Sequence, residues 1–292
     1  MTLLVLGAGG QIGRAIVERA SAGVRGFDKS ACNICDADAV ARAMSIEGLS
    51  AVVNCAAYTA VEQAESDREH AFAVNERGAA TVARLSAERH LPLIHLSTDY
   101  VYDGARNGRH VEEEPLAPCN VYGEAKAAGD RAVAALNPDH IVLRVSWVFG
   151  VYGANFVKTM LRLGKIKPAL SVVDDQRGGP TEARDIADAI LTMWRLSRES
   201  GFQSWGAYNF AGEPSTTWCA FAREIFDRAG GPSPGILPVR SDEFPTKAAR
   251  PLNSVLDCSK IRRVFGIGQP DWRKSLARVL TSLDESRPRG VR

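Results

Sequence analysis

The sequence predicts an α/β fold in which a Rossmann-type, doubly wound parallel sheet carries a smaller C-terminal lobe for substrate binding. Nearly unbroken apolar runs of strand length alternate with helical patterns, and a glycine-rich turn joins the first run to the first helix. The runs lack the alternating polar residues of half-exposed strands, as expected when helices cover both faces of a sheet. The length of 292 residues fits one large domain or an α/β domain with a second lobe.

The first 150 residues alternate between strands and helices. Apolar runs predict strands at residues 3–6, 24–28, 51–57, 93–96 and 141–145. Helical spacing of apolar residues predicts helices at residues 11–22, 36–46, 67–90 and 122–136. Asp36 is the predicted N-cap of the second helix. A long irregular stretch at 98–119 breaks the order, and loops of that length usually carry function.

Beyond Gly150 the pattern loosens, and the chain is expected to leave and re-enter the sheet. Helices are predicted at 155–163 and 182–197, and strands are predicted near 171–173 and 208–211. A further helix is expected to be capped by Thr216 and to end at Gly230-Gly231. Two final helices are predicted after the proline-rich segment 232–251. We therefore predict a nucleotide-cofactor-binding domain (1–148 with 172–212), a substrate-binding lobe (149–171 with 213–285) and a solvated, arginine-rich tail (286–292).

Composition narrows the class of protein. The formal net charge is +2, and no long basic run is interleaved with aromatic residues, so we expect no nucleic-acid partner. The apolar runs are far shorter than the roughly 20 residues needed to cross a bilayer. The first residues lack the pattern of an export signal, so we expect a cytoplasmic protein. The six cysteines are scattered as in a reducing compartment, and Cys32 and Cys35 have no second pair at zinc spacing.

The glycine-rich turn has the context of a dinucleotide-binding fingerprint. Residues 7–13 read Gly-Ala-Gly-Gly-Gln-Ile-Gly between the first predicted strand and helix. Glycines let the backbone turn tightly and approach a pyrophosphate, while the helix N-terminus stabilises negative charge. Asp28 follows the second strand, where a carboxylate accepts hydrogen bonds from ribose hydroxyls and favours NAD. Lys29 could instead pair with a 2′-phosphate, so NADPH and NADH both stay open, and the two charges could also be plain loop residues.

Tyr122 and Lys126 stand at positions i and i+4 of a predicted helix, so both project from one face. Hydride delivery to a ketone leaves charge on its oxygen, and a nearby acid must supply a proton. A free tyrosine titrates near pH 10, so an adjacent cation would bring its pKa closer to the working pH. The same spacing of a tyrosine and a lysine also occurs by chance on exposed helices, so the assignment depends on the motifs around it.

Together these motifs resemble the extended short-chain dehydrogenase/reductase family, and within it the dTDP-4-dehydrorhamnose reductase branch. In open α/β sheets ligands bind at the carboxyl ends of strands, where most of the motifs lie. The matching stretches cover almost the whole chain, at residues 7–13, 56–65, 97–102, 120–126, 144–150, 155–156, 175–176, 179–181 and 250–254.

The resemblance implies reduction of the 4-keto group of dTDP-4-dehydro-L-rhamnose to dTDP-L-rhamnose, a precursor of surface polysaccharide. Tyr122 would protonate the oxygen, Lys126 would hold the nicotinamide ribose and lower the Tyr122 pKa, and Thr98 would donate a hydrogen bond to the substrate oxygen. The cofactor would contact Gly7, Gly10, Gln11, Ile12, Gly13, Asp28, Lys29, Asn33, Ile34, Cys55, Ala56, Ala57, Leu96, Tyr122 and Lys126. The substrate would contact Thr98, Asp99, Tyr100, Trp147, Asn155 and Arg250, although Trp147 could also be a core residue.

The sequence also departs from this branch. Some members hold a magnesium ion at a dimer interface through two carboxylates, and Ala15 and Arg184 stand at those positions here. We therefore expect no metal site, and the chain could be a monomer or a homodimer. Two alternatives stay open: a reductase of another nucleotide-linked 4-keto sugar, and a non-catalytic regulatory subunit resembling the β subunit of methionine adenosyltransferase.

Overall fold

A six-stranded parallel sheet forms the centre of the protein. The structure, a computed structural model, describes residues 1–20, 22–230 and 233–285. The predicted tail (286–292), Gly231 at the predicted end of one helix and Ser21 of the predicted helix at 11–22 lie outside these ranges. The sheet confirms the predicted doubly wound fold, and its strand order is β10 (Gly206–Phe210), β5 (His140–Val145), β4 (Leu93–Thr98), β3 (Leu49–Asn54), β1 (Thr2–Leu6) and β2 (Val24–Phe27).

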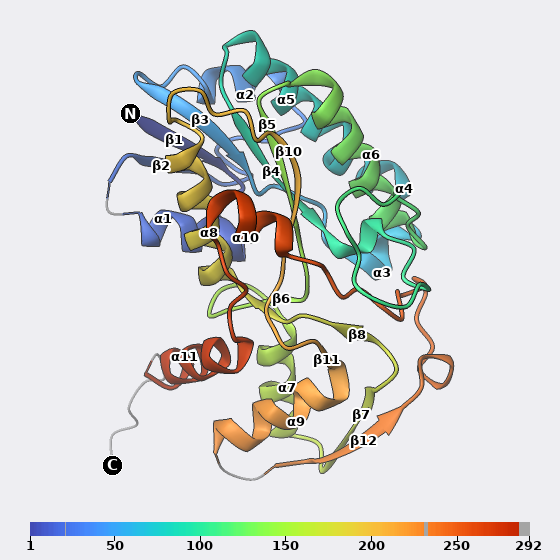
Figure 1. Cartoon of the computed structure of the whole chain (residues 1–292). Helices are drawn as coiled ribbons and strands as arrows, with labels where there is room; N and C mark the ends of the chain where they lie inside the picture. Colours follow the sequence, from blue (N-terminus) through green and yellow to red (C-terminus); the bar gives the residue numbers. More distant parts are fainter. Residues whose placement is uncertain (21, 231–232, 286–292) are drawn as a thin grey trace.

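Helices cover both faces of this sheet because successive strand residues point to opposite sides. In β1, Leu3 and Val5 join one hydrophobic core, while Leu4 and Leu6 join the other. The first core includes residues of α1 (Gln11–Arg19), α8 (Ala183–Leu196) and α10 (Ser259–Phe265) (Figure 1). The second is covered by α2 (Ala37–Ala43), α5 (Ala79–Glu88) and α6 (Val121–Leu136). In the sheet, β2 lies on one side of β1, and β3 and the later strands lie on the other side. The strand order therefore reverses beside β1, and ligands of such sheets bind at this switch point.

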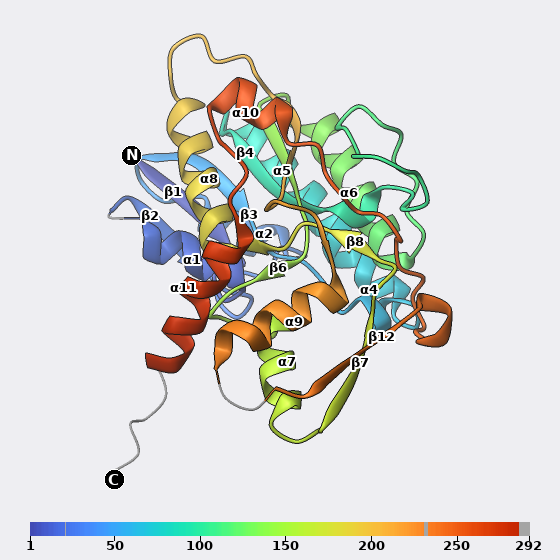
Figure 2. The ribbon, with the colours of Figure 1, turned by 60° about the horizontal axis from the view of Figure 1, so that its bottom comes forward.

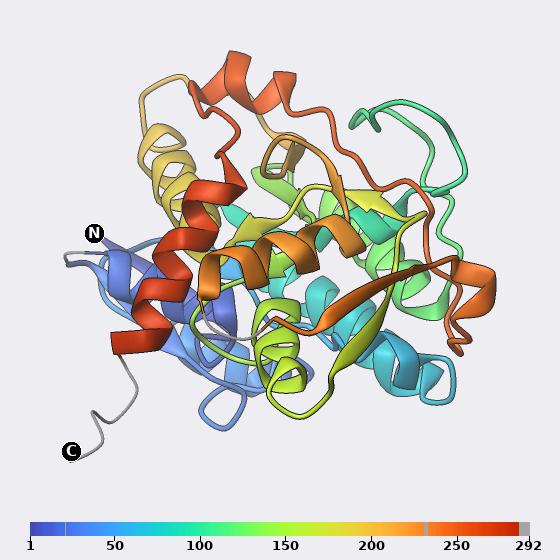
Figure 3. The ribbon, with the colours of Figure 1, turned by 90° about the horizontal axis from the view of Figure 1, so that it is seen from below.

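A smaller lobe lies below the sheet and has its own core (Figure 2). It contains α7 (Phe156–Gly164), α9 (Trp218–Ala229), α11 (Trp272–Glu285) and the parallel pair β7 (Ala169–Val173) and β12 (Gly235–Val239). Figure 3 shows α9 lying across α7, with the β7–β12 pair beside them. Two short strand pairs lie between the sheet and this lobe: β6 (Val148–Phe149) with β9 (Thr181–Glu182), and β8 (Arg177–Gly178) with β11 (Thr216–Thr217).

The helix predicted at 67–90 is three pieces in the structure. An α-helix, α4 (Arg68–Phe72), is followed by a π-helical turn, η1 (Ala73–Gly78), and then by α5; a short α3 (Val61–Ala64) precedes them. Within the π-turn, the Asn75 side chain accepts a hydrogen bond from the Tyr58 backbone N–H at 2.9 Å and donates to the Tyr58 carbonyl oxygen at 3.0 Å. The local widening of the helix thus fixes the loop that follows β3, and π-turns often lie at functional sites.

Other boundaries also differ from the predictions. The first helix ends at Arg19, and Thr217, not Thr216, caps α9 by accepting from the Ala220 N–H. The proline-rich segment holds the strand β12, which pairs only with β7, and a short 3-10 turn, η3 (Ser241–Glu243). Prolines are tolerated in such edge strands. The packing also changes the proposed domain division: α10 packs with the sheet, and β7 packs in the smaller lobe.

Candidate active site

Three adjoining cavities run along the carboxyl ends of the strands into the smaller lobe. The glycine-loop cavity, of about 420 Å³, lies at the β1–β3 switch point. The tyrosine cavity, of about 600 Å³, shares Gly10, Cys55 and Ala57 with it. The lobe cavity, of about 960 Å³, lies between α7, β7 and the segment 241–250, and shares Phe156, Trp218 and Arg250 with the tyrosine cavity. The site is therefore one extended crevice.

The glycine loop has two different kinds of glycine. Gly7 has φ +82°, and a Cβ there would lie 2.5 Å from the Ala56 backbone nitrogen. A Cβ on Gly13 would lie 2.4 Å from the Gly7 carbonyl oxygen, so packing within the protein requires both glycines. Gly10 lines both neighbouring cavities, and a Cβ there would meet only the Gly7 oxygen, at 3.4 Å. The absence of a side chain at Gly10 leaves the floor of the crevice open for a bound group.

The same loop leads into α1, whose N-terminus lies at this floor. The N-cap residue, Gly10, has no side chain to cap the helix, and the first turn has no acidic residue. Gln11, Ile12 and Gly13 of that turn line the tyrosine cavity. An uncapped helix N-terminus offers backbone N–H donors and a positive dipole end to an anion. This arrangement fits the pyrophosphate of a dinucleotide.

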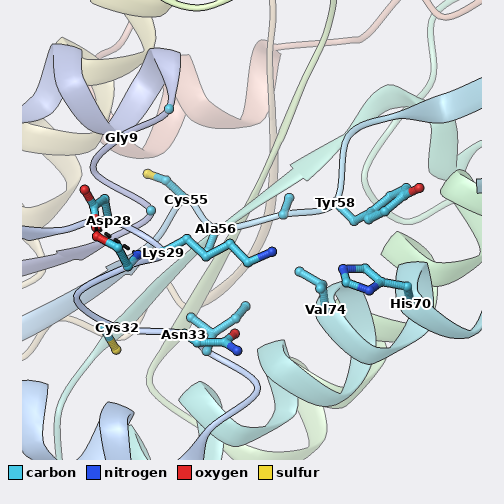
Figure 4. Close-up of a pocket in the computed structure, with 15 residues that line it drawn as sticks. Gly9, Asp28, Lys29, Cys32, Asn33, Cys55, Ala56, Tyr58, His70 and Val74 are labelled. Carbon is cyan, nitrogen blue, oxygen red and sulfur yellow. Dashed lines mark hydrogen bonds between the residues drawn. The ribbon is translucent and has the colours of Figure 1, made fainter. Parts of the chain in front are cut away.

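Asp28 and Lys29 line the outer end of the glycine-loop cavity. One Asp28 carboxylate oxygen accepts from the Ser30 N–H at 2.9 Å, the Ser30 hydroxyl at 2.6 Å and the Ala31 N–H at 3.0 Å. The hydrogen bond from the Ser30 hydroxyl is the largest cause that lowers the pKa of Asp28. Lys29 reaches across the cavity toward Val74 (Figure 4). A carboxylate and an amine are thus both present where an adenosine ribose would lie.

The structure brings together every residue that the sequence predicted to bind the cofactor. Those on the glycine-loop cavity are Gly7, Gly10, Asp28, Lys29, Asn33, Ile34, Cys55, Ala56 and Ala57. Those on the tyrosine cavity are Gln11, Ile12, Gly13, Leu96, Tyr122 and Lys126. Sequence reasoning missed Tyr58, His70 and Val74, which also line the first cavity. Val74 lies in the π-turn and Tyr58 is held by Asn75 of that turn, which has no sequence signature.

Lys126 lies one turn after Tyr122 on α6, and its side chain is 2% exposed. The Nζ atom donates to the Leu96 carbonyl oxygen at 2.6 Å and lies 3.2 Å from His95 Nε2. Burial lowers the pKa of Lys126 to about 8, against the opposing effect of the Asp130 carboxylate. The amine can therefore change its charge near neutral pH.

The Tyr122 side chain is partly buried, and desolvation raises the pKa of its phenol, with the Thr98 hydroxyl acting in the opposite direction. The structure thus gives a direction opposite to the lowered pKa that was predicted for Tyr122. The Lys126 amine donates its hydrogen bond to the Leu96 carbonyl oxygen and not to the phenol. Desolvation is therefore the largest influence on the pKa of Tyr122. A phenol with a raised pKa carries its proton at neutral pH, which a proton donor requires.

Two predicted substrate residues have other partners. The Asp99 carboxylate is buried and accepts from the Thr98 hydroxyl at 2.9 Å and from the Ser146 hydroxyl at 2.8 Å. Asp99, in the turn η2 (Asp99–Val101), lines the tyrosine cavity, but its side chain orients Thr98. Asn155 caps α7 and donates to Gln11 Oε1 at 2.9 Å, and it is absent from the lining of the three described cavities. The structure therefore gives no support to its predicted contact with the substrate.

An aromatic wall separates the tyrosine cavity from the lobe cavity. Trp147 has φ +46° and stacks on Trp218 with ring centroids 3.5 Å apart and an interplanar angle of 6°. Gly178 makes room for this ring, since a Cβ there would lie 2.4 Å from it. Phe156 packs against Trp218 at 4.6 Å. Trp147 is thus a cavity wall as well as a packed residue, and Trp218 was missed because a tryptophan at a helix start is read as core.

Arg250 lies where the tyrosine and lobe cavities meet. Its Nη2 atom pairs with Glu62 at 2.6 Å, whereas its Nε atom is buried and has no hydrogen-bond partner among the described residues. A guanidinium with an unused donor is suited to a phosphate oxygen. The prediction that Arg250 faces the substrate crevice agrees with this placement.

The described part of the chain contains no group of three or more His, Cys, Asp or Glu side chains placed to hold a metal ion. Within the same residues, no helix is both long and apolar enough to cross a membrane.

Comparisons with known proteins show the family to which the chain belongs. A family model described as the RmlD substrate binding domain matches residues 1–285. The dTDP-4-dehydrorhamnose reductase of Aggregatibacter actinomycetemcomitans is 40% identical over 95% of this chain and 97% of its own, and that of Sinorhizobium fredii is 41% identical over 97% and 98%. The crystal structure of the Bacillus anthracis enzyme of that name, in complex with NADP, superposes with a TM-score of 0.90 at 35% identity over 97% of this chain and all of that one. The chain therefore belongs to the RmlD family, among the dTDP-4-dehydrorhamnose reductases.

Proposed function

We propose that this protein uses NADPH or NADH to reduce the 4-keto group of dTDP-4-dehydro-L-rhamnose to dTDP-L-rhamnose. The observation that carries the proposal is the placement of Thr98, Tyr122 and Lys126 on one cavity between the glycine loop and Arg250. The family and the printed names of its members support the choice of substrate.

Different residues along the crevice bind different parts of the cofactor and the substrate. The glycine loop and the N-terminus of α1 would hold the pyrophosphate of the nicotinamide dinucleotide, which would supply the hydride when bound. The keto sugar lies beside Tyr122, with Trp147 and Tyr100 as walls. Arg250 binds the diphosphate, and the lobe cavity has room for the base.

Proton supply follows from the environment of Tyr122. The raised pKa keeps the phenol protonated until charge develops on the substrate oxygen. The Thr98 hydroxyl accepts from the Tyr100 N–H at 3.2 Å and is directed by Asp99, so its position next to the phenol is fixed. Lys126 supplies a nearby positive charge below its pKa of about 8. The reacting oxygen is thus placed among preset donors, which lowers the barrier without reorganisation.

The proposal is tested by the loss of nicotinamide absorbance with enzymatically generated dTDP-4-dehydro-L-rhamnose, with NADPH and NADH in parallel. Turnover to dTDP-L-rhamnose, identified by chromatography against an authentic standard, supports it. A folded, cofactor-binding protein that turns over only another nucleotide-linked 4-keto sugar, or none, overturns the choice of substrate. The expected cytoplasmic location and the choice between monomer and homodimer stay predictions.

We expect Asp28 and Lys29 to set the cofactor preference in opposite directions. Lys29→Ala should raise the KM for NADPH about tenfold and leave the KM for NADH nearly unchanged, because one charge-assisted contact to a 2′-phosphate is lost. Asp28→Ala should raise the KM for NADH, because the ribose hydroxyls lose their acceptor. Initial rates at varied cofactor concentration measure both effects. Equal changes for both cofactors in Lys29→Ala would show that Lys29 is only a loop charge.

Glu62 should act on substrate binding through Arg250 and its segment. One Glu62 oxygen pairs with Arg250, and the other accepts from the Lys247 N–H at 2.8 Å. Glu62→Ala should raise the KM for the nucleotide sugar about tenfold and change kcat much less. Without its partner, Arg250 is no longer held in place to bind the phosphate, and the expected loss in binding is roughly that of one charged hydrogen bond. Glu62→Gln keeps the length of the side chain and one acceptor oxygen, so it should raise this KM less than Glu62→Ala and is the matched control. A loss confined to kcat in Glu62→Ala would contradict this role.

A further inference from the structure

Asn54, His95 and Lys126 form a buried chain of polar side chains beneath the tyrosine cavity. Asn54 ends β3, His95 pairs with it in register on β4, and Lys126 reaches the sheet from α6. Asn54 and His95 are 0% exposed. Asn54 Nδ2 lies 3.2 Å from His95 Nδ1, and His95 Nε2 lies 3.2 Å from Lys126 Nζ. Asn54 and His95 have no part in the steps described above.

The hydrogen positions in this chain follow from one backbone donor. The Ala56 N–H can only donate, and it bonds to Asn54 Oδ1 at 3.1 Å. The amide nitrogen of Asn54 therefore faces His95, so His95 Nδ1 is an acceptor without a hydrogen. Burial, followed by the Lys126 charge, holds the pKa of His95 well below its usual value. The ring is neutral, and its one N–H is on Nε2, directed at Lys126.

We propose that His95 is a positioning residue for Lys126, donating its Nε2–H to the Lys126 amine while that amine donates to the Leu96 carbonyl oxygen. The role rests on the proposed function only in that Lys126 serves the reduction. An ammonium group has no lone pair and cannot accept this bond. When Lys126 is charged, its ammonium group must therefore move away from His95 Nε2. Otherwise the Asn54 amide must turn and break its hydrogen bond to the backbone N–H of Ala56, a residue that lines the glycine-loop cavity.

The chain consequently favours the neutral amine and adds to the effect of burial. The charged or titratable groups that act on this pair are Asp130 on α6, Cys55 after β3 and His140 on β5. Asp130 and Cys55 raise the pKa of Lys126, whereas burial lowers it to about 8. His140 and Lys126 lower the pKa of His95. Because the reduction needs the positive form of Lys126, kcat/KM should fall as the pH rises through about 8.

A pH profile of kcat/KM separates positioning from mere packing. His95→Phe keeps an aromatic ring but removes the donor to the neutral amine, so the alkaline limb should move up by about one pH unit, the equivalent of one hydrogen bond. His95→Gln places an amide N–H near the former Nε2 position and should restore the parent limb. Tyr208→Phe, which removes a buried hydroxyl outside the three cavities, should keep it. An unshifted limb in His95→Phe overturns the proposal.

A second readout needs no substrate. In ¹⁵N-histidine NMR of the cofactor-free protein, which has five histidines, the His95 signal is the one lost in His95→Phe. We expect a neutral ring protonated on Nε2, with a chemical-shift step near pH 8 that Lys126→Met abolishes. A ring protonated on Nδ1, or titration at an ordinary imidazole pKa, overturns the proposal. If the protein gives the expected NMR result but shows no turnover, the positioning role of His95 is supported and the proposed reductase function is rejected.

Discussion

Tyr122→Phe should lower kcat at least about a hundredfold, the lower end of what a general acid contributes. The variant keeps the ring and its edge contact with Tyr100 at 5.7 Å, so it loses only the hydroxyl, with its proton, its hydrogen bond to the developing oxyanion and its interaction with the Thr98 hydroxyl. Cofactor affinity, measured by fluorescence titration, should stay within about threefold, because the glycine loop and Lys126 are intact. The KM for the nucleotide sugar should change little for the same reason.

Tyr208→Phe is the matched control, because Tyr208 is a buried tyrosine outside the crevice whose hydroxyl donates to the Ser204 carbonyl oxygen at 2.6 Å. That variant should lose some stability, by about one hydrogen bond, and keep its kcat. A Tyr122→Phe protein that folds, binds the cofactor and turns over within about tenfold of the parent would remove Tyr122 from the role of proton donor.

The sequence predicts the central sheet well because its signals are local. Each buried strand is a short apolar run, and Gly7 and Gly13 mark a tight turn between β1 and α1 in which a Cβ at either position would clash. Tyr122 and Lys126 could be placed on one face of α6 from their spacing alone. Their meeting with Thr98 and Trp147 needed the family resemblance, because nothing local relates those segments.

The missed features depend on long-range contacts or on backbone geometry. Asn75 widens its helix to bind the backbone of Tyr58, and no residue pattern specifies such a turn. The strand β12 contains a proline and is stabilised by pairing with β7, some 65 residues away, so its own sequence predicts a loop. Asp99 and Asn155 follow the family motifs, yet the folded chain uses their side chains to bind Thr98 and Gln11. A sequence motif thus predicts where a residue lies in the fold, but the hydrogen-bond partners of its side chain depend on the residues packed around it.

Arg144→Met should cause the largest loss of stability, about 3–5 kcal/mol in the free energy of unfolding. Arg144 on β5 pairs with Asp130 at 3.1 Å, and the two side chains are 6% and 4% exposed. Its other donors reach the Tyr102 hydroxyl at 2.8 Å and the Glu112 carbonyl oxygen at 3.1 Å. The variant leaves a buried carboxylate without its cation, one helical turn beyond Lys126. Denaturant unfolding followed by circular dichroism measures the loss.

Two further variants show why the loss arises. Arg84→Met breaks an i,i+4 pair with Glu88 whose side chains are about half exposed, and it should cost no more than about 0.5 kcal/mol. Arg144→Met combined with Asp130→Leu should regain a large part of the lost stability, because the unpaired buried charge, and not the missing attraction, is the main cost. If Arg144→Met were no less stable than Arg84→Met, the pair would not anchor α6 to the sheet. The stripe of Tyr122, Lys126 and Asp130 would then be held in place by apolar packing and by the contacts of Lys126 with Leu96 and His95.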